Sequence, residues 1–324
     1  MLDTWVPLIA GLALLVIGGE LLVRGAVQAA ERFGISPLVI GLTLVGFGTS
    51  MPELVTSVQA GLSGSPGIAY GNIVGSNIAN ILLIAGVSAL ICPVIVAHSA
   101  LRRDAMAMLL ATVVFAALAL LVAMGRIVGA ALLAVLVLYL VFVIRQERSG
   151  PEGGALLDKS LALAGADPDL AAPHPARTVA IPLLITLAGL VIVVAGGALL
   201  VDGAVALARG FGVSETVIGL TIVAVGTSMP ELVTSVIAAL KRQGDVAFGN
   251  VVGSNIYNIL GIGGTTALIA PSQVPSGIAA FDAPLMVGVS VLLVVFAATG
   301  LRIARREGVV LVAGYAAYLW ILWP

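Results

Sequence analysis

The chain has 324 residues, of which 60% are hydrophobic and only 10% are charged, and its mean hydropathy is +1.18. These values lie outside the range of soluble domains and indicate a polytopic membrane protein. A net charge of -1 gives no electrostatic basis for binding nucleic acid, and one cysteine, Cys92, excludes an internal disulfide framework or a thiolate metal cluster.

Segments of about 20 apolar residues predict ten transmembrane helices, so the expected fold is all-α. In chain order the predicted spans cover residues 5 to 28, 36 to 62, 66 to 91, 103 to 124, 126 to 145, 178 to 206, 214 to 240, 246 to 269, 281 to 300 and 306 to 323. The first segment lacks the basic region and cleavage site of a secretory signal, so we interpret it as a retained span.

One predicted connection is long. Residues 147 to 177 are rich in proline, glycine, alanine and aspartate, which is typical of a linker loop. The linker separates residues 1 to 146 from residues 178 to 324, and each of these parts contains five predicted spans. Two five-helix units are therefore expected.

The two units repeat each other at a constant offset of 178 residues. Residues 41 to 58 (GLTLVGFGTSMPELVTSV) match residues 219 to 236 at 15 of 18 positions, and residues 71 to 82 (GNIVGSNIANIL) match residues 249 to 260 at 10 of 12 positions. Because each unit has an odd number of spans, the second unit would enter the membrane in the opposite sense. The sequence thus predicts inverted-topology repeats with broken helices at the centre, as in secondary transporters.

Basic residues predict the orientation, because they are retained on the cytoplasmic side of a membrane. If the N-terminus lies outside, 13 of the 15 lysine and arginine residues fall in or beside cytoplasmic connections, and only Arg126 and Arg209 lie outside. We therefore expect a multi-pass protein of the cell membrane, plasma or inner, in contact with the lipid bilayer. Both termini would be outside and the long loop cytoplasmic.

Each repeat places one glutamate, Glu53 or Glu231, in an otherwise apolar span, and intramembrane acids generally mark ion pathways. Pro52 and Pro230 precede these acids, lack a backbone N–H and predict a helix break that frees carbonyl oxygens. Hydroxyl groups three and four residues before each acid share its helix face, namely those of Thr49, Ser50, Thr227 and Ser228. Such oxygens suit hard cations, so Glu53 and Glu231 are predicted metal ligands for Ca²⁺ or Na⁺.

The second motif of each repeat supplies further oxygens at helical spacing. Ser76 and Asn80 lie four residues apart, as do Ser254 and Asn258, and we predict that all four bind the cation. For other polar residues of these helices, helix–helix contact and a role in the ion path both stay open. These residues are Asn72, Asn77, Asn250, Asn255, Thr56, Ser57, Thr234 and Ser235.

The third acid within a span, Glu20, has a different interpretation. Its repeat partner is Ala198, and Arg24 follows it by four residues. This spacing favours a local ion pair near the end of a helix over a role in transport.

With GTSMPELVTS in both units, GNIVGSNIAN in the first and GNVVGSNIYN in the second, the chain resembles the cation/Ca²⁺ exchanger superfamily over nearly its whole length, and is most similar to prokaryotic Na⁺/Ca²⁺ exchangers. The resemblance implies a four-helix core whose cation sites use the ten residues from Thr49 to Asn258 named above, with backbone carbonyls near Gly46 and Ala224. It also implies that the first span of each unit slides across this core. Several such exchangers have an aspartate where this chain has Asn258, so two acids are expected here instead of three.

The expected function is therefore a secondary antiporter that exchanges cytoplasmic Ca²⁺ for Na⁺ by alternating access, with no cofactor and no obligatory protein partner. A Ca²⁺/H⁺ antiporter of the same superfamily is the nearest alternative, although its members resemble GNxxE more than GTSxPE. A cation channel is a further alternative. An intramembrane hydrolase is disfavoured because HExxH, a GxGD-like aspartate pair and a histidine within a span are all absent from the sequence.

Overall fold

The computed structural model describes residues 2–32, 46–147 and 180–322, which are almost entirely helical. The linker predicted at 147 to 177 lies outside these residues except for its first position, as does the start of the span predicted at 36 to 62. Within the described ranges, six helices are long and apolar enough to cross a membrane, or seven if one bent pair counts as a single span. The chain is thus a helical membrane protein with several spans, and the set of ten stays a prediction.

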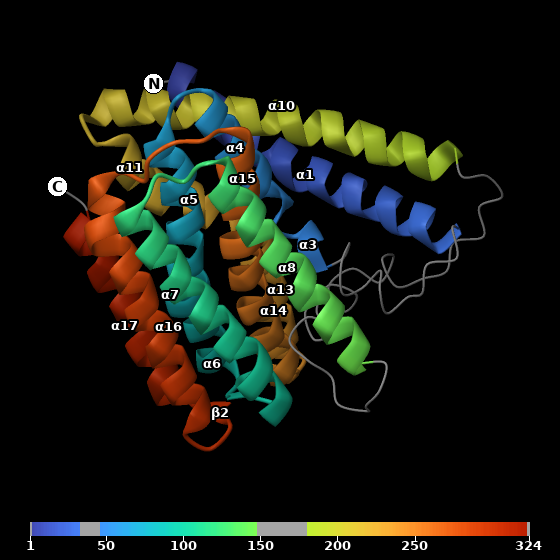
Figure 1. Cartoon of the computed structure of the whole chain (residues 1–324), viewed down its shortest axis with the longest axis vertical. Helices are drawn as coiled ribbons and strands as arrows, with labels where there is room; N and C mark the ends of the chain where they lie inside the picture. Colours follow the sequence, from blue (N-terminus) through green and yellow to red (C-terminus); the bar gives the residue numbers. More distant parts are fainter. Residues whose placement is uncertain (1, 33–45, 148–179, 323–324) are drawn as a thin grey trace.

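The described part of the first unit consists of helices, two π-helical segments and one short strand (Figure 1). Its elements are α1 (Leu2–Arg32), α3 (Gly46–Gly48), α4 (Met51–Leu62), α5 (Pro66–Ala79), η2 (Asn80–Ala85), α6 (Gly86–Ile91), β1 (Val94–Ile95), η3 (Ala100–Ala105), α7 (Met106–Leu121) and α8 (Arg126–Glu147).

The second unit has a similar order of elements. These are α10 (Ala180–Phe211), α11 (Glu215–Ile218), η5 (Gly219–Val223), α12 (Ala224–Thr227), α13 (Met229–Leu240), α14 (Gly244–Ile256), η6 (Tyr257–Ile262), α15 (Gly263–Ile269), η7 (Ile278–Asp282), α16 (Ala283–Ala298), β2 (Arg302–Ile303) and α17 (Arg305–Leu322).

The predicted span at 214 to 240 corresponds to the bent pair, and the one at 36 to 62 is described only in part. Two further predicted spans are helical but belong neither to the six long apolar helices nor to the bent pair. The span at 246 to 269 corresponds to the continuous run α14–η6–α15, which contains polar residues such as Asn250, Ser254 and Asn258. The span at 306 to 323 corresponds to α17, whose first turn carries two arginines and a glutamate. Both segments therefore combine the length of a span with a less apolar sequence.

The long helices α1 and α10 lie side by side along one edge of the bundle (Figure 1). Glycines at every seventh position, 11, 18 and 25 in α1 and 189, 196 and 203 in α10, face the partner helix. A Cβ atom at Gly18 would lie 2.7 Å from the backbone nitrogen of Val193, and one at Gly203 would lie 2.7 Å from that of Leu8. The two backbones are therefore in direct contact, as small residues permit at membrane helix interfaces.

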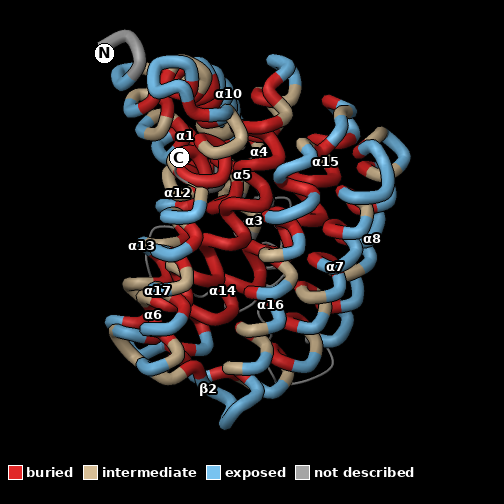
Figure 2. Tube along the Cα trace, turned by 90° about the vertical axis from the view of Figure 1, so that its left-hand side faces the viewer, coloured by how far each residue is buried: buried red, intermediate tan, exposed pale blue. Residues whose placement is uncertain are grey.

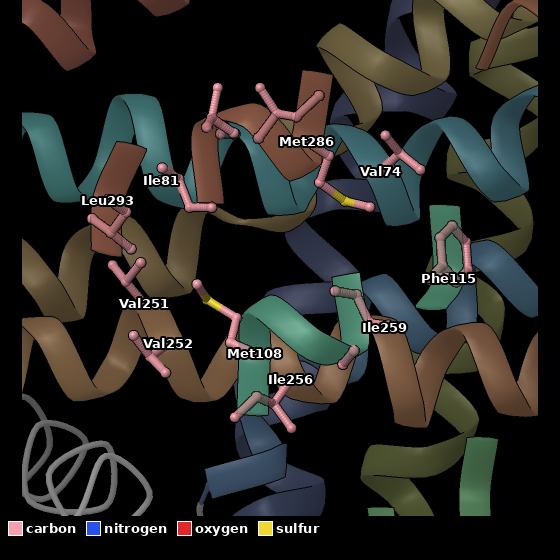
Figure 3. Packing of buried hydrophobic residues seen from close by; sticks show 14 of the residues in the cluster. Val74, Ile81, Met108, Phe115, Val251, Val252, Ile256, Ile259, Met286 and Leu293 are labelled. Atoms are coloured by element: carbon pink, nitrogen blue, oxygen red, sulfur yellow. The ribbon is translucent and has the colours of Figure 1, made fainter. Parts of the chain in front are cut away.

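Buried residues concentrate in the centre of the bundle, along α5 and α14 (Figure 2). The main hydrophobic cluster includes residues from both units that match at the 178-residue offset, such as Val74 with Val252 and Met108 with Met286 (Figure 3). The same sequence pattern therefore serves both units in a shared core, which surrounds the polar segments described below.

Short backbone pairings also join the two units, and their residues Val94, Ile303 and Met124 belong to the main hydrophobic cluster. Strands β1 and β2 pair antiparallel, with Val94 opposite Ile303 and Ile95 opposite Arg302. Met124 and Ser272 form an isolated antiparallel bridge, in which each backbone nitrogen donates to the other residue's carbonyl at 3.1 and 3.2 Å. At the repeat offset Met124 matches Arg302 and Ser272 matches Val94, so equivalent connections are used twice.

Candidate cation-binding site

Each candidate glutamate lies in the first turn of a helix that begins at a break. In the second unit, the segments Glu215–Thr227 and Met229–Leu240 meet at an angle of 49°. Ser228, with φ -82° and ψ 10°, interrupts the helical backbone there, and Ser50 has nearly the same angles, -86° and 8°. Pro52 and Pro230 occupy the first turns of α4 and α13, where the missing N–H breaks no helical hydrogen bond. The positive end of each helix dipole thus lies near a carboxylate.

Each glutamate accepts a hydrogen bond from the serine at the helix break of the other unit. Ser50 Oγ donates a hydrogen bond of 3.0 Å to Glu231 Oε1, and Ser228 Oγ donates one of 2.8 Å to Glu53 Oε1. Both glutamates are 1% exposed, so these carboxylates are enclosed by protein. The arrangement brings both acids and both serines, all predicted ligands, into one buried polar cluster.

Asn72 and Asn250 fix the backbones that carry the acids. Asn72 Nδ2 donates to the carbonyl oxygen of Glu53 at 3.1 Å and to Ser57 Oγ at 2.9 Å. Asn250 Nδ2 donates in the same way to the carbonyl of Glu231 at 3.0 Å and to Ser235 Oγ at 2.8 Å. The sequence left the role of these residues open. The repeat keeps the 19-residue spacing from acid to asparagine in both units, but this spacing does not show which group the amide contacts.

The remaining hydroxyls of the motif differ between the two units. Thr227 Oγ1 donates to Asn72 Oδ1 at 2.9 Å, and Ser76 Oγ contacts the same oxygen at 3.5 Å and the carbonyl of Ala224 at 3.4 Å. Ser254 Oγ instead donates to Glu231 Oε1 at 3.4 Å. Ser254 therefore contacts a glutamate directly. Ser76 and Thr227 instead contact Asn72, whose amide donates to the Glu53 backbone.

Three further predicted ligands are buried and have a side-chain oxygen without a hydrogen-bond partner among the described residues. Asn80 Nδ2 donates to Asn255 Oδ1 at 3.0 Å, but Asn80 Oδ1 has no hydrogen-bond partner among the described residues. The same holds for Thr49 Oγ1 and for both side-chain polar atoms of Asn258. Because buried polar atoms normally have partners, these oxygens are suited to binding a cation.

Asn80 and Asn258 also lie where the helices change their winding. Asn80 is the first residue of η2, and Asn258 is the second residue of η6. The sequence predicted uninterrupted helices here, because nothing in the apolar spacing marks a π-helical segment. Such segments occur often at functional sites, since they redirect side chains within a helix.

The donor set as a whole consists of oxygens. Among residues 2–32, 46–147 and 180–322, no three histidine, cysteine, aspartate or glutamate side chains are grouped to hold a metal. A cation would therefore be held by two carboxylates together with hydroxyl, amide and carbonyl oxygens, which suits Ca²⁺ or Na⁺ better than a transition metal.

Glu20 does not belong to this cluster. It forms an ion pair with Arg24 at 2.6 Å on α1, and its side chain is 49% exposed. The predicted local ion pair is present.

Comparison with known proteins agrees with this chemistry. A family model described as sodium/calcium exchanger protein matches residues 4–145 and 181–323. The sodium/calcium exchanger MaX1 of Methanosarcina acetivorans is 36% identical over 97% of each chain, and the inner membrane protein YrbG of Escherichia coli is 35% identical over 98% of this chain and 95% of its own. A solved structure of the sodium–calcium exchanger NCX_Mj, soaked with Na⁺ and Sr²⁺, aligns with a TM-score of 0.63 and 32% identity, covering 98% of this chain and 97% of that one.

Proposed function

The chain belongs to the sodium/calcium exchanger protein family, and from that premise we propose that it exchanges cytoplasmic Ca²⁺ for Na⁺ by alternating access at the site of Glu53 and Glu231. The family consists of ion exchangers and not of enzymes. Ca²⁺ and Na⁺ are accordingly substrates of the site, and no cofactor enters the proposed cycle.

The crossed hydrogen bonds between the two helix breaks carry this proposal. Each acid is held by a serine of the opposite unit, so both carboxylates can act on one ion. Two ionised glutamates balance the charge of one Ca²⁺. When Ca²⁺ leaves, the same negative oxygens attract Na⁺ instead, which is the physical basis of exchange at a shared site.

The proposed ligands are Thr49, Ser50, Glu53, Ser76 and Asn80 with their repeat partners Thr227, Ser228, Glu231, Ser254 and Asn258. The hydrogen bonds among the serines and glutamates support the central members. The buried oxygens of Thr49, Asn80 and Asn258 that lack partners among the described residues support the outer members.

We further propose ten spans in two inverted repeats, 1 to 146 and 178 to 324, joined by a cytoplasmic linker. Support comes from the matched residues of the core and from the two backbone pairings, which use equivalent connections of the two units. The distribution of basic residues supports termini on the outside. The similarity to an Escherichia coli inner membrane protein supports the inner or plasma membrane as the location.

In the proposed cycle, α1 and α10 slide together across the core. Their backbones touch at the glycines of the seven-residue series, so the pair is expected to move as one body. Its other face meets the core at Gly19, where the nearest atom to an added Cβ would be Pro52 Cδ at 3.9 Å. This contact places the sliding pair directly against the helix break beside Glu53.

The experiment is uptake of radioactive Ca²⁺ into proteoliposomes loaded with Na⁺, with equal pH on both sides. The proposal expects uptake that requires the outward Na⁺ gradient and ceases when Na⁺ is equal on both sides. Uptake that needs only a proton gradient would assign the protein to Ca²⁺/H⁺ exchange. Counterflow of labelled Ca²⁺ against unlabelled Ca²⁺, measured with the membrane potential held at zero, tests alternating access, because a channel then accumulates no label.

A further inference from the structure

A cavity of about 430 Å³ lies at the end of the molecule where α6, α13 and α17 meet. Its wall includes Cys92 from the segment after α6, Leu240 at the end of α13, and two arginines, Arg242 and Arg305. The cavity is separate from the glutamate cluster, and no step of the proposed transport cycle uses it.

Arg242 has a backbone conformation that L residues rarely adopt. Its φ is 59°, in the left-handed region, at the end of α13. The backbone N–H of Arg242 donates to Ala239 and that of Gln243 to Ala238, which forms the usual C-terminal helix motif. Glycine is the residue that favours this position. At the matching position of the first unit the chain has Gly64, with φ 75°.

The positions equivalent to the two arginines in the first unit are uncharged. At the 178-residue offset, Gly64 matches Arg242 and Ile127 matches Arg305. The general excess of basic residues on one membrane face accounts for positive charge at this end. It does not account for an arginine in a strained position that lines a cavity. Strain of this kind points to a function of the side chain.

The rest of the wall is partly apolar and partly exposed. Leu240 is 67% exposed, and Ile91 and Pro93 complete the lining beside it. Arg305 Nη2 donates to the carbonyl of Ile91 at 3.1 Å, which uses one of the five N–H donors of the guanidinium group. Two arginines in a wall that also carries exposed apolar residues match an amphiphile that carries a phosphate group.

We propose that this cavity binds the headgroup of an anionic phospholipid, with Arg242 and Arg305 bound to its phosphate oxygens and the acyl chains along Leu240. The ligand contacts the last turn of α13, the helix that begins beside Glu231, and the end of α6, which continues the helix of Ser76 and Asn80. A bound lipid therefore holds together the ends of two helices that carry the cation site.

The first test is thermal unfolding of the purified full chain in detergent with added short-chain phosphatidylglycerol, phosphatidylcholine or inorganic phosphate. Phosphatidylglycerol should raise Tm, and the increase should grow with lipid concentration, because a ligand that binds only the folded state stabilises it. Phosphatidylcholine and inorganic phosphate should give little change. An equal increase with inorganic phosphate would overturn the assignment to a lipid.

The decisive variant is Arg242→Gly with Arg305→Ile, which installs the residues found at the equivalent positions of the first unit. Because glycine relieves the left-handed strain, this variant should fold at least as well without lipid. It should need roughly tenfold more phosphatidylglycerol for the same increase in Tm, since charge-assisted hydrogen bonds are lost. Arg306→Gln, which removes an exposed charge nearby outside the cavity wall, should respond as the original protein does. An unchanged response of the double variant, or an equal loss in Arg306→Gln, would contradict the proposal.

Cys92 provides a second measurement because it is the only cysteine and lines the cavity. Phosphatidylglycerol should slow its reaction with a small maleimide in the original protein but not in Arg242→Gly/Arg305→Ile. Equal labelling rates with and without lipid in the original protein would exclude a headgroup at this position. Neither measurement depends on transport, so both can fail while the proposed exchange stands.

Discussion

Ser50 and Glu231 are 181 residues apart in the chain, yet the Ser50 hydroxyl donates a hydrogen bond of 3.0 Å to the Glu231 carboxylate. The reverse bond, from Ser228 to Glu53, is 2.8 Å long. Neither acid is therefore positioned by its own unit alone. Any motion that separates the two helix breaks changes the environment of both carboxylates together.

Replacing Ser50 and Ser228 by alanine tests this relationship. A hydrogen bond to a charged group contributes about 1.5–3 kcal/mol, so each single variant should raise the KM for Ca²⁺ about tenfold or more, and the double variant should lose most transport. Initial rates of Ca²⁺ uptake in proteoliposomes measure this. Ser290→Ala is the matched control, because Ser290 is equally buried but donates to Met286 within its own helix. Wild-type KM values in both single variants would contradict the crossed arrangement.

Much of the fold could be predicted because two signals in the sequence are strong, namely the long apolar runs and the repeat at an offset of 178 residues. Long apolar runs predicted the helical membrane class, and residues such as Met108 and Met286 share a core in the way that the repeat offset suggests. The π-helical segments beginning at Asn80 and Tyr257 were not predicted, since one extra residue in a turn leaves apolar spacing nearly unchanged. Bounds also differ: the span expected to begin at 281 begins at Ile278.

The chemistry of the site was easier to predict than its connections. Acids and hydroxyls in lipid-like sequence identified Glu53 and Ser50, because polar groups there need a reason. That Ser50 binds the opposite acid could not be read from the sequence, since it depends on how two helix breaks pack. Asn72 shows the same limit: its amide supports the Glu53 carbonyl, a contact fixed by packing and not by helical spacing.

Adjacent glycines of α1 give a matched test of the α1–α10 contact. Gly18→Ala places a methyl group 2.7 Å from the Val193 backbone nitrogen, and such overpacking costs about 1–3 kcal/mol. Gly19→Ala meets only Pro52 at 3.9 Å and should be neutral or stabilising by up to about 1 kcal/mol, because alanine favours helix. Thermal unfolding in detergent compares them. Equal Tm values for the two variants would show that the backbones are not in contact.

Two tyrosines of α17 test a second buried polar contact. Tyr318 OH donates to Asp282 Oδ1 at 2.9 Å, and Asp282 is 3% exposed. Tyr318→Phe should cost about 1–3 kcal/mol, because it removes a donor from a buried carboxylate. Tyr315→Phe should change stability little, since the Tyr315 hydroxyl has no hydrogen-bond partner among the described residues. Unfolding by denaturant measures both. Similar losses in both variants would indicate that ring packing alone is responsible.

Asn258 tests the outer part of the cation site. Its side-chain oxygen is buried without a hydrogen-bond partner in the described part of the chain. Asn258→Leu removes this oxygen and should raise the KM for Ca²⁺ about tenfold, whereas Asn258→Asp keeps an oxygen and should stay within about threefold at neutral pH. Uptake titrated with Ca²⁺ at fixed Na⁺ gives the values. If the leucine variant kept the original KM, Asn258 would not be a ligand.

The most direct measurement is Na⁺-driven uptake of radioactive Ca²⁺ by Glu53→Gln and Glu231→Gln, with Glu20→Gln as the control. Glutamine keeps the size of each side chain and removes its charge, so either site variant would leave Ca²⁺ with one carboxylate. We predict that exchange is abolished in both site variants and retained in Glu20→Gln, whose acid is half exposed and paired with Arg24. Near-normal Ca²⁺ exchange in either Glu53→Gln or Glu231→Gln would contradict a shared two-glutamate site.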